Sequence, residues 1–434
     1  MTNAAKKPVF ADAGDLDKAD DRLAGAGFAV DQFGAPHAEQ PGAALPAGEF
    51  DVLVVGAGLA GLQCARLLGR GGRRVLLADR KRAVDEAVHT TGIFVRRTLE
   101  DFRLPEDCLG PAVRHVTLYS PARRKLELAS AHDEFRVGRM GRLYLRLLSE
   151  CRASGVAWSP ETRYLASEGA AEGGDSLVRL ERGGREFAVR ARFVIGADGA
   201  RSRVARDLGL DENREWIVGV EDVYAGARAD GPPRFHCFLD PRVAPGYLAW
   251  VVSDGEETHV GVGGYAARFD PARALEMFRA SLDGIVDLTG AHRVERRGGR
   301  IPVGGVLRRI ACARGLLVGD AAGAVSPLTA GGLDPCLRLS TLAARVADEY
   351  LSTGDPSVLA PYSGRAFRAR FTSRLWMRRL LGNVRTPLLA EAACAALRLP
   401  PFTSLARHVF FGRGSFPDVR DERARLLTRE APSS

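Results

Sequence analysis

A glycine-rich turn after an apolar segment is the strongest chemical signal in the sequence. Residues 56–61 read GAGLAG; they follow the apolar run 50–55 and open a stretch with helical spacing of apolar residues. In a turn of this kind Gly56 permits the sharp bend, Gly58 lets a pyrophosphate approach the backbone, and Gly61 lets the helix pack on the strand. The start of the helix then offers free N–H groups to phosphates. The spacing predicts a dinucleotide-binding strand, turn and helix.

An acidic side chain follows the next apolar segment. Asp79 ends the run 74–79 and stands 23 residues after Gly56. At that place a carboxylate can accept hydrogen bonds from ribose hydroxyls, and it disfavours a 2′-phosphate. The sequence therefore predicts that this site does not hold NADP, whereas NAD and FAD both stay open.

Two later segments repeat the arrangement of an apolar strand followed by an aspartate. Residues 193–204 read FVIGADGARSRV, and residues 315–323 read GLLVGDAAG. Asp198 and Asp320 therefore each follow a predicted buried strand. Asp320 also precedes a helical stretch, where an acid can cap free N–H groups and bond to hydroxyls.

The three segments, in this order and at these distances, resemble the FAD-binding flavoproteins built like p-hydroxybenzoate hydroxylase. The finer match, over residues 50–375, is to their geranylgeranyl reductase branch. The resemblance implies that FAD is the cofactor, that Asp320 meets its ribityl chain and that Asp198 lies near its pyrophosphate. The cofactor-binding residues that the motifs and the resemblance imply are Gly56, Gly58, Ala60, Gly61, Asp79, Arg80, Thr90, Thr91, Arg139, Asp198, Gly199, Gly319, Asp320, Gly331, Gly332 and Leu333.

Local features favour the reductase branch of this family. Residues 300–305 (RIPVGG) resemble that branch, and Gly323 stands where aromatic hydroxylases usually have histidine. Tyr247 and Trp250 are similar to a strand pair that faces the substrate in the branch. The chain departs from the branch at residues 330–332, where Ala-Gly-Gly replaces the usual Gly-Glu-Gly.

The predicted catalytic residues are His89, Tyr247 and Trp250. His89 lies next to the expected flavin edge, where a group that titrates near neutrality could pass protons. A loop histidine bonded to the backbone is an equally good interpretation of this residue, and the aromatic pair would line a pocket or fill the core. The other seven histidines show no ligand spacing, so no metal site is expected.

These features predict an FAD-dependent oxidoreductase that reduces carbon–carbon double bonds of an apolar, prenyl-type substrate. NAD(P)H or another reduced donor would supply the electrons. The main alternative is a flavin-dependent monooxygenase that hydroxylates an apolar or aromatic small molecule. A third hypothesis is a non-redox role for FAD, as in flavin-dependent cyclases. A halogenase is disfavoured because the paired tryptophans and proline of those enzymes are missing.

The cofactor motifs require a sheet of buried parallel strands to position them. The predicted fold class is α/β: a Rossmann-type FAD-binding domain with an inserted antiparallel β-rich substrate domain and a helical C-terminal tail. A hairpin is predicted around Gly183-Gly184, with helices over 139–155 and 271–282. The predicted parts are a mobile N-terminal arm (1–49, with one short helix over 16–23), a discontinuous FAD-binding domain (50–111, 136–215 and 304–351), a substrate domain (112–135 and 216–303) and a helical basic C-terminal region (352–434).

Composition and charge restrict the class of partner. The 434 residues hold 62 Lys and Arg against 53 Asp and Glu, a net charge of +9 that favours anionic partners. The seven cysteines are scattered and form no C-x-x-C pair, which suits a reducing compartment. No apolar run reaches the roughly 18 residues of a spanning helix, so a cytoplasmic location is expected. Nucleic acid is not expected, because no binding fold accompanies the charge.

The segment 365–385 interleaves arginines with apolar residues at a spacing of four. This pattern predicts an amphipathic basic helix. Two interpretations stay open: a helix that packs on the FAD-binding domain with a solvated basic face, or a helix that contacts a membrane surface or an anionic substrate. Peripheral membrane contact is therefore a further expectation.

Overall fold

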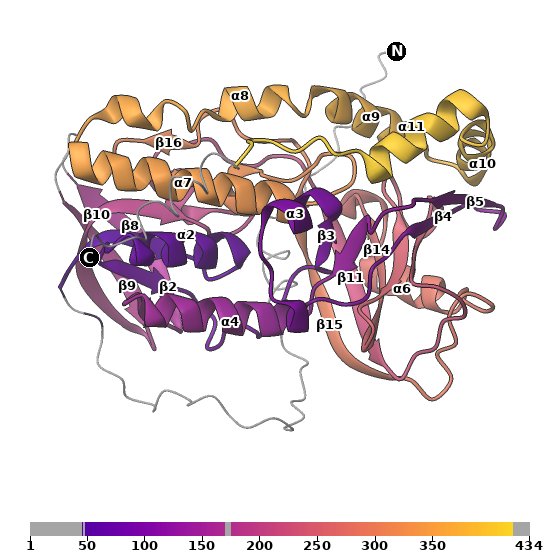
Figure 1. Ribbon diagram of the computed structural model, residues 1–434, viewed down its shortest axis with the longest axis horizontal. Helices are drawn as coiled ribbons and strands as arrows, with labels where there is room; N and C mark the ends of the chain where they lie inside the picture. The colour runs from indigo at the N-terminus through magenta and orange to yellow at the C-terminus, as the bar shows by residue number, and fades with distance from the viewer. Residues whose placement is uncertain (1–45, 47, 170–174, 420–434) are drawn as a thin grey trace, which may run out of the picture.

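The computed structural model describes residue 46 and residues 48–169 and 175–419. The predicted arm over 1–49 lies almost wholly outside these residues, and so does the short helix predicted over 16–23. Two large sheets and a layer of helices make up the described part of the chain (Figure 1).

The first sheet carries the three predicted cofactor motifs. Its main strands run in the order β16-β17-β10-β1-β2-β7, with β9 on β10 and β8 on β9. The pairs β1/β10, β1/β2, β10/β17 and β2/β7 are parallel. Because other elements cover both faces of the parallel part of this sheet, its central segments Val52–Val55, Val75–Ala78, Phe193–Ile195 and Gly315–Leu317 are apolar and buried. The strands are β1 (Glu49–Val55), β2 (Val75–Ala78), β7 (Ala157–Ser159), β8 (Thr162–Gly169), β9 (Ser176–Arg182), β10 (Arg185–Gly196), β16 (Ala311–Cys312) and β17 (Gly315–Leu317).

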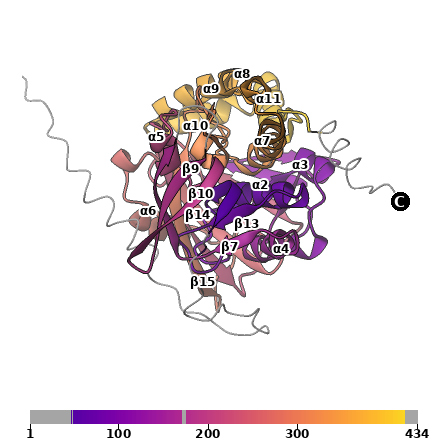
Figure 2. The same ribbon diagram turned by 90° about the vertical axis from the view of Figure 1, so that its left-hand side faces the viewer.

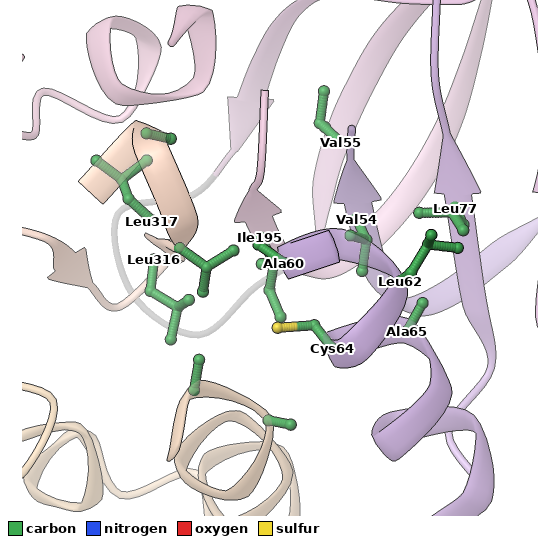
Figure 3. Packing of buried hydrophobic residues seen from close by; sticks show 14 of the residues in the cluster. Val54, Val55, Ala60, Leu62, Cys64, Ala65, Leu77, Ile195, Leu316 and Leu317 are labelled. Carbon is green, nitrogen blue, oxygen red and sulfur yellow. The ribbon is translucent and has the colours of Figure 1, made fainter. Parts of the chain in front are cut away.

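Helix α2 (Leu59–Arg70) lies between α4 (Met140–Ala153) and α7 (Leu333–Thr353) and packs on this sheet. The close view shows its small side chains Ala60, Cys64 and Ala65 among residues of the strands and of β17 (Figure 3). Small residues on this face let the helix approach the strands closely. That approach places the start of α2 at the ends of β1 and β10.

A fully buried arginine joins α7 to the short helix α3 (Arg96–Asp101). The Arg338 guanidinium contacts the carboxylates of Asp101 at 2.7 Å and Asp334 at 2.9 Å. A buried charge needs such partners, because its desolvation is costly. The pair of contacts fixes the first turns of α7 relative to α3.

The second sheet has the strand order β15-β11-β14-β13-β12-β4-β5 and is antiparallel except for the pair β12/β4. Helix α6 (Pro271–Arg279) packs on β11 and β14, with Asp270 capping its first turn. Two short strands, β3 (Ile93–Val95) and β6 (Phe135–Val137), pair separately. The strands are β4 (His115–Tyr119), β5 (Lys125–Ala129), β11 (Trp216–Ala225), β12 (Arg234–Phe238), β13 (Ala249–Ser253), β14 (Glu257–Gly264) and β15 (His292–Pro302).

The tail forms a layer of helices along one side of the molecule, over α7 (Figures 1 and 2). Its helices are α8 (Gly364–Ala369), α9 (Thr372–Asn383), α10 (Pro387–Ala396) and α11 (Pro400–Phe411). Shorter helical pieces are α5 (Arg203–Asp207), η1 (Glu106–Cys108), η2 (Ala266–Arg268), η3 (Gly319–Ala322) and η4 (Pro356–Leu359). None of the helices in the described ranges is both long and apolar enough to cross a membrane.

The structure corrects the prediction for the basic tail segment. The predicted helix over 365–385 is broken between α8 and α9. On α9, Arg378 is buried at 3% exposure, whereas Trp376 is 61% and Leu380 65% exposed. The buried Arg378 guanidinium is stabilised by cation–π contacts, since it lies 5.6 Å from the ring centroid of Tyr247 and 4.8 Å from that of Tyr265. Trp376 and Leu380 therefore face outward, whereas Arg378 faces inward.

The other predicted elements need smaller corrections. The predicted hairpin around 183–184 is confirmed as β9 and β10. The helix predicted over 271–282 ends at Arg279. Within the stretch 112–129, β4 and β5 pair as a hairpin. The long helix before Leu351 begins only at Leu333, after an irregular loop over 323–332 that we call the 323–332 loop.

Candidate cofactor and substrate site

The three glycine and aspartate motifs meet at the carboxyl ends of β1, β10 and β17. A Cβ on Gly56, whose φ is +103°, would lie 2.3 Å from the Ala197 carbonyl oxygen. A Cβ on Gly61 would lie 1.8 Å from the Gly56 carbonyl oxygen, and one on Gly319 would lie 2.8 Å from the Ala60 Cβ. Glycine is therefore required at these three positions for packing alone. The close approach brings segments far apart in sequence to one edge of the sheet.

Gly58 differs from its neighbours. A Cβ there would meet no atom within 4 Å, and its φ of −75° suits any residue. The fold therefore does not explain glycine at this position. The open space lies at the start of α2, where unpaired N–H groups and the helix dipole favour an anion. A pyrophosphate fits both observations.

Asp79 is buried at the end of β2 and supports the glycine-rich turn. Its Oδ2 accepts from the Ala57 amide at 2.6 Å, and its Oδ1 accepts from the Lys81 amide at 2.8 Å. Because a carboxylate offers about four lone-pair sites, it keeps capacity for ribose hydroxyls. Arg80, the next residue, is exposed.

Asp198 follows β10 and has one oxygen without a partner. Its Oδ2 accepts from the amides of Arg203 at 2.7 Å and Val204 at 3.2 Å, at the start of α5. Its Oδ1 is buried and accepts no hydrogen bond, and burial raises the pKa of the carboxyl. Gly199 has a φ of +83° and open space around its Cβ position. The Oδ1 atom of Asp198 is thus a buried acceptor that can take a hydrogen bond from a ligand.

Asp320 does not cap a helix, contrary to the prediction. Val318 precedes η3 and Gly332 precedes α7, and neither cap involves the Asp320 carboxylate. No donor from the described chain bonds to this carboxylate, and burial raises its pKa to about 6. It lies 3.7 Å from the Cβ position of Gly332. The carboxylate is therefore available to a ligand hydroxyl.

Asn213 clamps the second and third motifs together, and the sequence analysis missed it. Its Nδ2 donates to the Ala200 carbonyl at 3.1 Å and to the Asp320 carbonyl at 2.8 Å. A lone asparagine after α5 carries no local signal, because its two acceptors belong to strand ends more than a hundred residues apart.

The 323–332 loop is held in place by Tyr247. The Tyr247 hydroxyl donates to the Thr329 carbonyl at 2.6 Å, and burial raises the pKa of this phenol. Ala330 has a φ of +50°, a left-handed conformation that costs a non-glycine residue about 1–2 kcal/mol. Gly331 is exposed and Leu333 half-buried at the start of α7. The hydroxyl thus helps to fix a strained loop.

These features fit FAD. The starts of α2 and α7 offer amides to phosphates and to other acceptors. The open space at Gly58 fits a pyrophosphate, and the unpaired oxygens of Asp198 and Asp320 fit hydroxyl or other donors of a dinucleotide. The remaining predicted contact, Arg139, stands at the start of α4, where its guanidinium donates to the carbonyls of Asp107 and Asp254.

Two of the three predicted catalytic residues, Tyr247 and Trp250, are buried in one cluster. His89 is exposed, and its Nδ1 lies 2.8 Å from the Gly298 carbonyl oxygen, in agreement with a loop histidine bonded to the backbone. Thr90 accepts from the Gly92 amide through its hydroxyl. Thr91 and Trp250 do meet: Thr91 Oγ1 at 2.6 Å and Trp250 Nε1 at 3.1 Å both donate to one oxygen of Glu221.

Glu221 is the centre of a buried polar cluster that the sequence analysis missed. Cross-strand register places Trp250, Gly261, Glu221 and Arg297 in one row across the second sheet. Because Gly261 has no side chain, the Trp250 indole lies over it and reaches Glu221; a Cβ on Gly261 would be 2.2 Å from the ring. Two adjacent acids, Glu221 and Asp222, in an otherwise apolar strand are the local signal that could have pointed to this cluster.

His259 completes this cluster between two carboxylates. Its Nδ1 lies 3.3 Å from Glu221 Oε1 and its Nε2 lies 3.9 Å from Asp254 Oδ2. Burial alone would lower the pKa of His259, but the carboxylates of Asp254 and Glu221 on either side of the ring raise it to about 9. Burial would raise the pKa of Glu221, yet His259, with Arg297 and Thr91, holds it at about 2. The cluster is therefore charged and fixes Thr91 beside Trp250.

Apolar side chains surround the Trp250 indole. Val137, Ile217, Val252 and Val303 are buried with it in one cluster, against which Ala330 of the 323–332 loop also packs. A Cβ on Gly219 would be 3.8 Å from the indole ring. The Trp250 indole is thus packed in a buried apolar cluster beside the 323–332 loop.

Comparison with known proteins identifies the family to which the chain is similar. The FAD binding domain family matches residues 49–375. The chain is 30% identical over 325 residues to a digeranylgeranylglycerophospholipid reductase of Methanosarcina acetivorans, covering 71% of this chain and 77% of the relative. It is 32% identical over 316 residues to digeranylgeranylglycerophospholipid reductase 1 of Methanopyrus kandleri, covering 71% and 83%.

Solved structures show the same fold at lower identity. A geranylgeranyl bacteriochlorophyll reductase-like protein of Thermoplasma acidophilum superposes with a TM-score of 0.73 at 20% identity, covering 88% of this chain and all (100%) of that protein. A p-nitrophenol 4-monooxygenase of Pseudomonas putida gives 0.61 at 18% identity, covering 89% and 98%. A flavin-dependent halogenase gives 0.61 at 18% identity, covering 88% and 70%.

The prediction of an FAD-dependent oxidoreductase with the p-hydroxybenzoate hydroxylase fold is confirmed. The resemblance to the geranylgeranyl reductase branch is also confirmed. The chain belongs to the FAD-binding oxidoreductase family that contains the archaeal digeranylgeranylglycerophospholipid reductases.

Proposed function

We propose that the protein reduces carbon–carbon double bonds of an apolar, prenyl-type substrate. The relatives that carry this proposal are named as reductases of a digeranylgeranyl lipid, and the apolar cluster around Trp250 suits such a chain. When bound, FAD supplies the hydride, taken from NAD(P)H or another reduced donor. One proton must be added to the second carbon of the double bond.

Each side chain of the site has a distinct proposed task. Trp250 forms the wall against which the alkene chain lies, and the charged Glu221 cluster keeps the indole in one orientation. Tyr247 holds the 323–332 loop through its hydroxyl, which is engaged with Thr329. His89 is the exposed titratable group near the expected flavin edge, and we assign it the exchange of the proton with solvent.

The chemistry is tested with pre-reduced protein under anaerobic conditions. A geranylgeranyl-bearing lipid should reoxidise the protein without oxygen, and in deuterated water deuterium from the solvent should enter the product. Replacement of His89 by glutamine should slow this step and leave flavin content unchanged. Reoxidation that needs oxygen, with one oxygen atom in the product, would overturn the reductase and favour the monooxygenase.

We also propose that the tail helices contact a membrane. Seven of the ten exposed large apolar side chains of the described chain lie in the tail, six on α9, α10 and α11 and one, Leu399, just before α11: Trp376, Leu380, Leu388, Leu389, Leu399, Phe402 and Leu405. Arginines such as Arg385 and Arg398 are exposed on the same segment. Apolar side chains bordered by cations are typical of helices that lie in a membrane interface.

Flotation with vesicles tests this contact. Replacement of Trp376 and Leu380 by serine should reduce recovery of the protein with anionic vesicles, because both side chains would leave the interface. The matched control replaces Leu177 and Met277, which are also exposed but lie outside the tail. Equal loss in both double variants would count against contact through the tail.

A further inference from the structure

A basic groove lies between α8, α9 and the segment before η3, away from the cofactor motifs. Its volume is about 320 Å³, and its lining includes Arg308, Arg365, Arg368, Leu375, Trp376 and Arg379. None of the residues that line it is acidic, and none belongs to the three cofactor motifs. The groove is therefore a separate site in which positive charge is concentrated.

None of the four guanidinium groups pairs with a carboxylate of the described chain, and Arg368 donates to backbone carbonyls instead. Across the described chain, the side chains of Arg308, Arg365 and Arg379 make no ion pair, and all three are exposed. Many other arginines of this protein pair with an acid, as Arg309 does with Asp211 at 3.7 Å. Unpaired like charges around one hollow repel each other, and an anion placed between them would remove that repulsion.

Arg368 is fixed at the base of the groove. Its Nη1 donates to the carbonyls of Gly304 at 2.7 Å and Val306 at 3.1 Å. Both bonds use only Nη1, so the Nη2 and Nε groups of the guanidinium can still donate to a ligand. Guanidinium groups bind phosphate oxygens in a bidentate manner, which distinguishes a phosphate from a simple counter-ion.

An apolar surface continues from one side of the groove. Trp376 belongs to the lining, is 61% exposed and lies 5.6 Å from the Arg379 guanidinium. Leu380, one turn further along α9, is 65% exposed. A ligand that matches both parts has an anionic group for the arginines and an acyl or prenyl chain for the apolar surface.

We propose that this groove binds the phosphate headgroup of an anionic membrane phospholipid. The groove would hold one headgroup, while Trp376 and Leu380 enter the bilayer beside it. The proposal rests on the membrane contact argued under the proposed function, and it is independent of the redox reaction. It adds a specific headgroup site to what would otherwise be diffuse attraction between a basic tail and a negative surface.

Holoprotein binding to vesicles of phosphatidylglycerol or phosphatidylcholine tests the proposal. The test variant combines Arg365→Gln and Arg379→Gln, and the control combines Arg385→Gln and Arg398→Gln, which removes two tail charges outside the groove. Diffuse attraction is worth about 1 kcal/mol for each cation, so it predicts the same loss of about 30-fold for both variants. A headgroup site predicts a loss at least about tenfold larger for the groove variant.

Three further results decide the interpretation. Saturation at one phosphatidylglycerol per chain, with partial competition by glycerol phosphate, would support the site. Equal losses in the two variants, or equal binding to both kinds of vesicle, would overturn it. Binding of inorganic phosphate in solution without any preference for anionic vesicles would assign the groove to a free phosphate and also overturn it. Flavin content and reduction of a short soluble alkene should be unchanged in the groove variant, whatever the fate of the reductase proposal.

Discussion

Replacement of Gly58 by valine should remove FAD and leave the apoprotein folded. A Cβ at this position meets no atom within 4 Å, and φ −75° with ψ −176° suits valine. Gly58 is the N-cap of α2, where valine is poorer than glycine, so the apoprotein should lose at most about 1 kcal/mol. A bound pyrophosphate, in contrast, would meet the isopropyl group in the space that glycine leaves open.

The matched control is Gly61→Ala, three residues along the same turn. Its Cβ would lie 1.8 Å from the Gly56 carbonyl oxygen, and overpacking of this kind costs about 1–3 kcal/mol or more. The control should therefore lose stability as apoprotein, whereas Gly58→Val should not.

The assay combines urea unfolding of the apoprotein with flavin absorbance per chain. Free FAD at a hundred times its dissociation constant should stabilise the wild-type protein by about 2.7 kcal/mol and the Gly58→Val protein by nothing. Wild-type flavin content in the Gly58→Val protein would refute the placement of the pyrophosphate. An apoprotein that fails to fold would refute the statement that the space is open.

Three other variants test particular contacts. The pKa of His259 is about 9 in the folded protein and near 6.5 in the unfolded chain. Protonated His259 should therefore contribute about 3 kcal/mol to the free energy of unfolding below pH 6.5, and this contribution should disappear as the pH rises through 9. Urea unfolding from pH 6 to 10 should show this decrease in stability, and His259→Gln should abolish it. Arg338→Met removes a buried charge from Asp101 and Asp334, so it should cost about 3 kcal/mol by urea unfolding, although Asp101 keeps Arg97 as a partner. The matched control is Arg82→Gln, which removes an exposed ion pair with Glu86 and should cost less than about 1 kcal/mol. Tyr247→Phe removes the donor to the Thr329 carbonyl, so the free energy of unfolding should fall by about 1–3 kcal/mol. Proteolysis of the 323–332 loop should also become faster, and an unchanged cleavage rate would contradict the role assigned to the Tyr247 hydroxyl.

The cofactor-binding half of the site could be predicted from the sequence because its signals are local. Gly56, Gly58 and Gly61 lie within six residues, and each sits next to a strand that is apolar along its whole length. A strand buried on both faces and a tight turn impose these residue types directly. The position of the three motifs at one edge then follows from the parallel order of the sheet.

The substrate side of the site depends on distant contacts and was predicted less completely. The Glu221 carboxylate contacts side chains from four separate segments: Thr91, Trp250, His259 and Arg297. No spacing rule connects them, because cross-strand register sets which residues become neighbours. The prediction that Asp320 caps a helix was wrong for a related reason. The apolar pattern predicted that the helix begins directly after Asp320, whereas α7 begins at Leu333.

The tail shows where amphipathic periodicity misleads. The spacing of Trp376 and Leu380 is that of a buried face, and the structure exposes both. Their place toward the interior is taken by Arg378, which two tyrosine rings accept. Periodicity identifies that a helix has two faces, but the partners available on the protein decide which face is covered.

The order of strands in the first sheet has a consequence for the life of the newly made chain. β1 is complete by residue 55, yet its sheet gains β17 only at residue 317, after the chain has built most of the second sheet. On the ribosome, Asp320 and the start of α7 are therefore synthesised after about three quarters of the protein. Cofactor capture must be a late event, and an abortive fragment that ends before β17 would expose an apolar strand edge instead of holding FAD. Exposed apolar strand edges are recognised by chaperones and proteases. The absorbance of bound flavin would therefore report only chains that have been synthesised beyond β17.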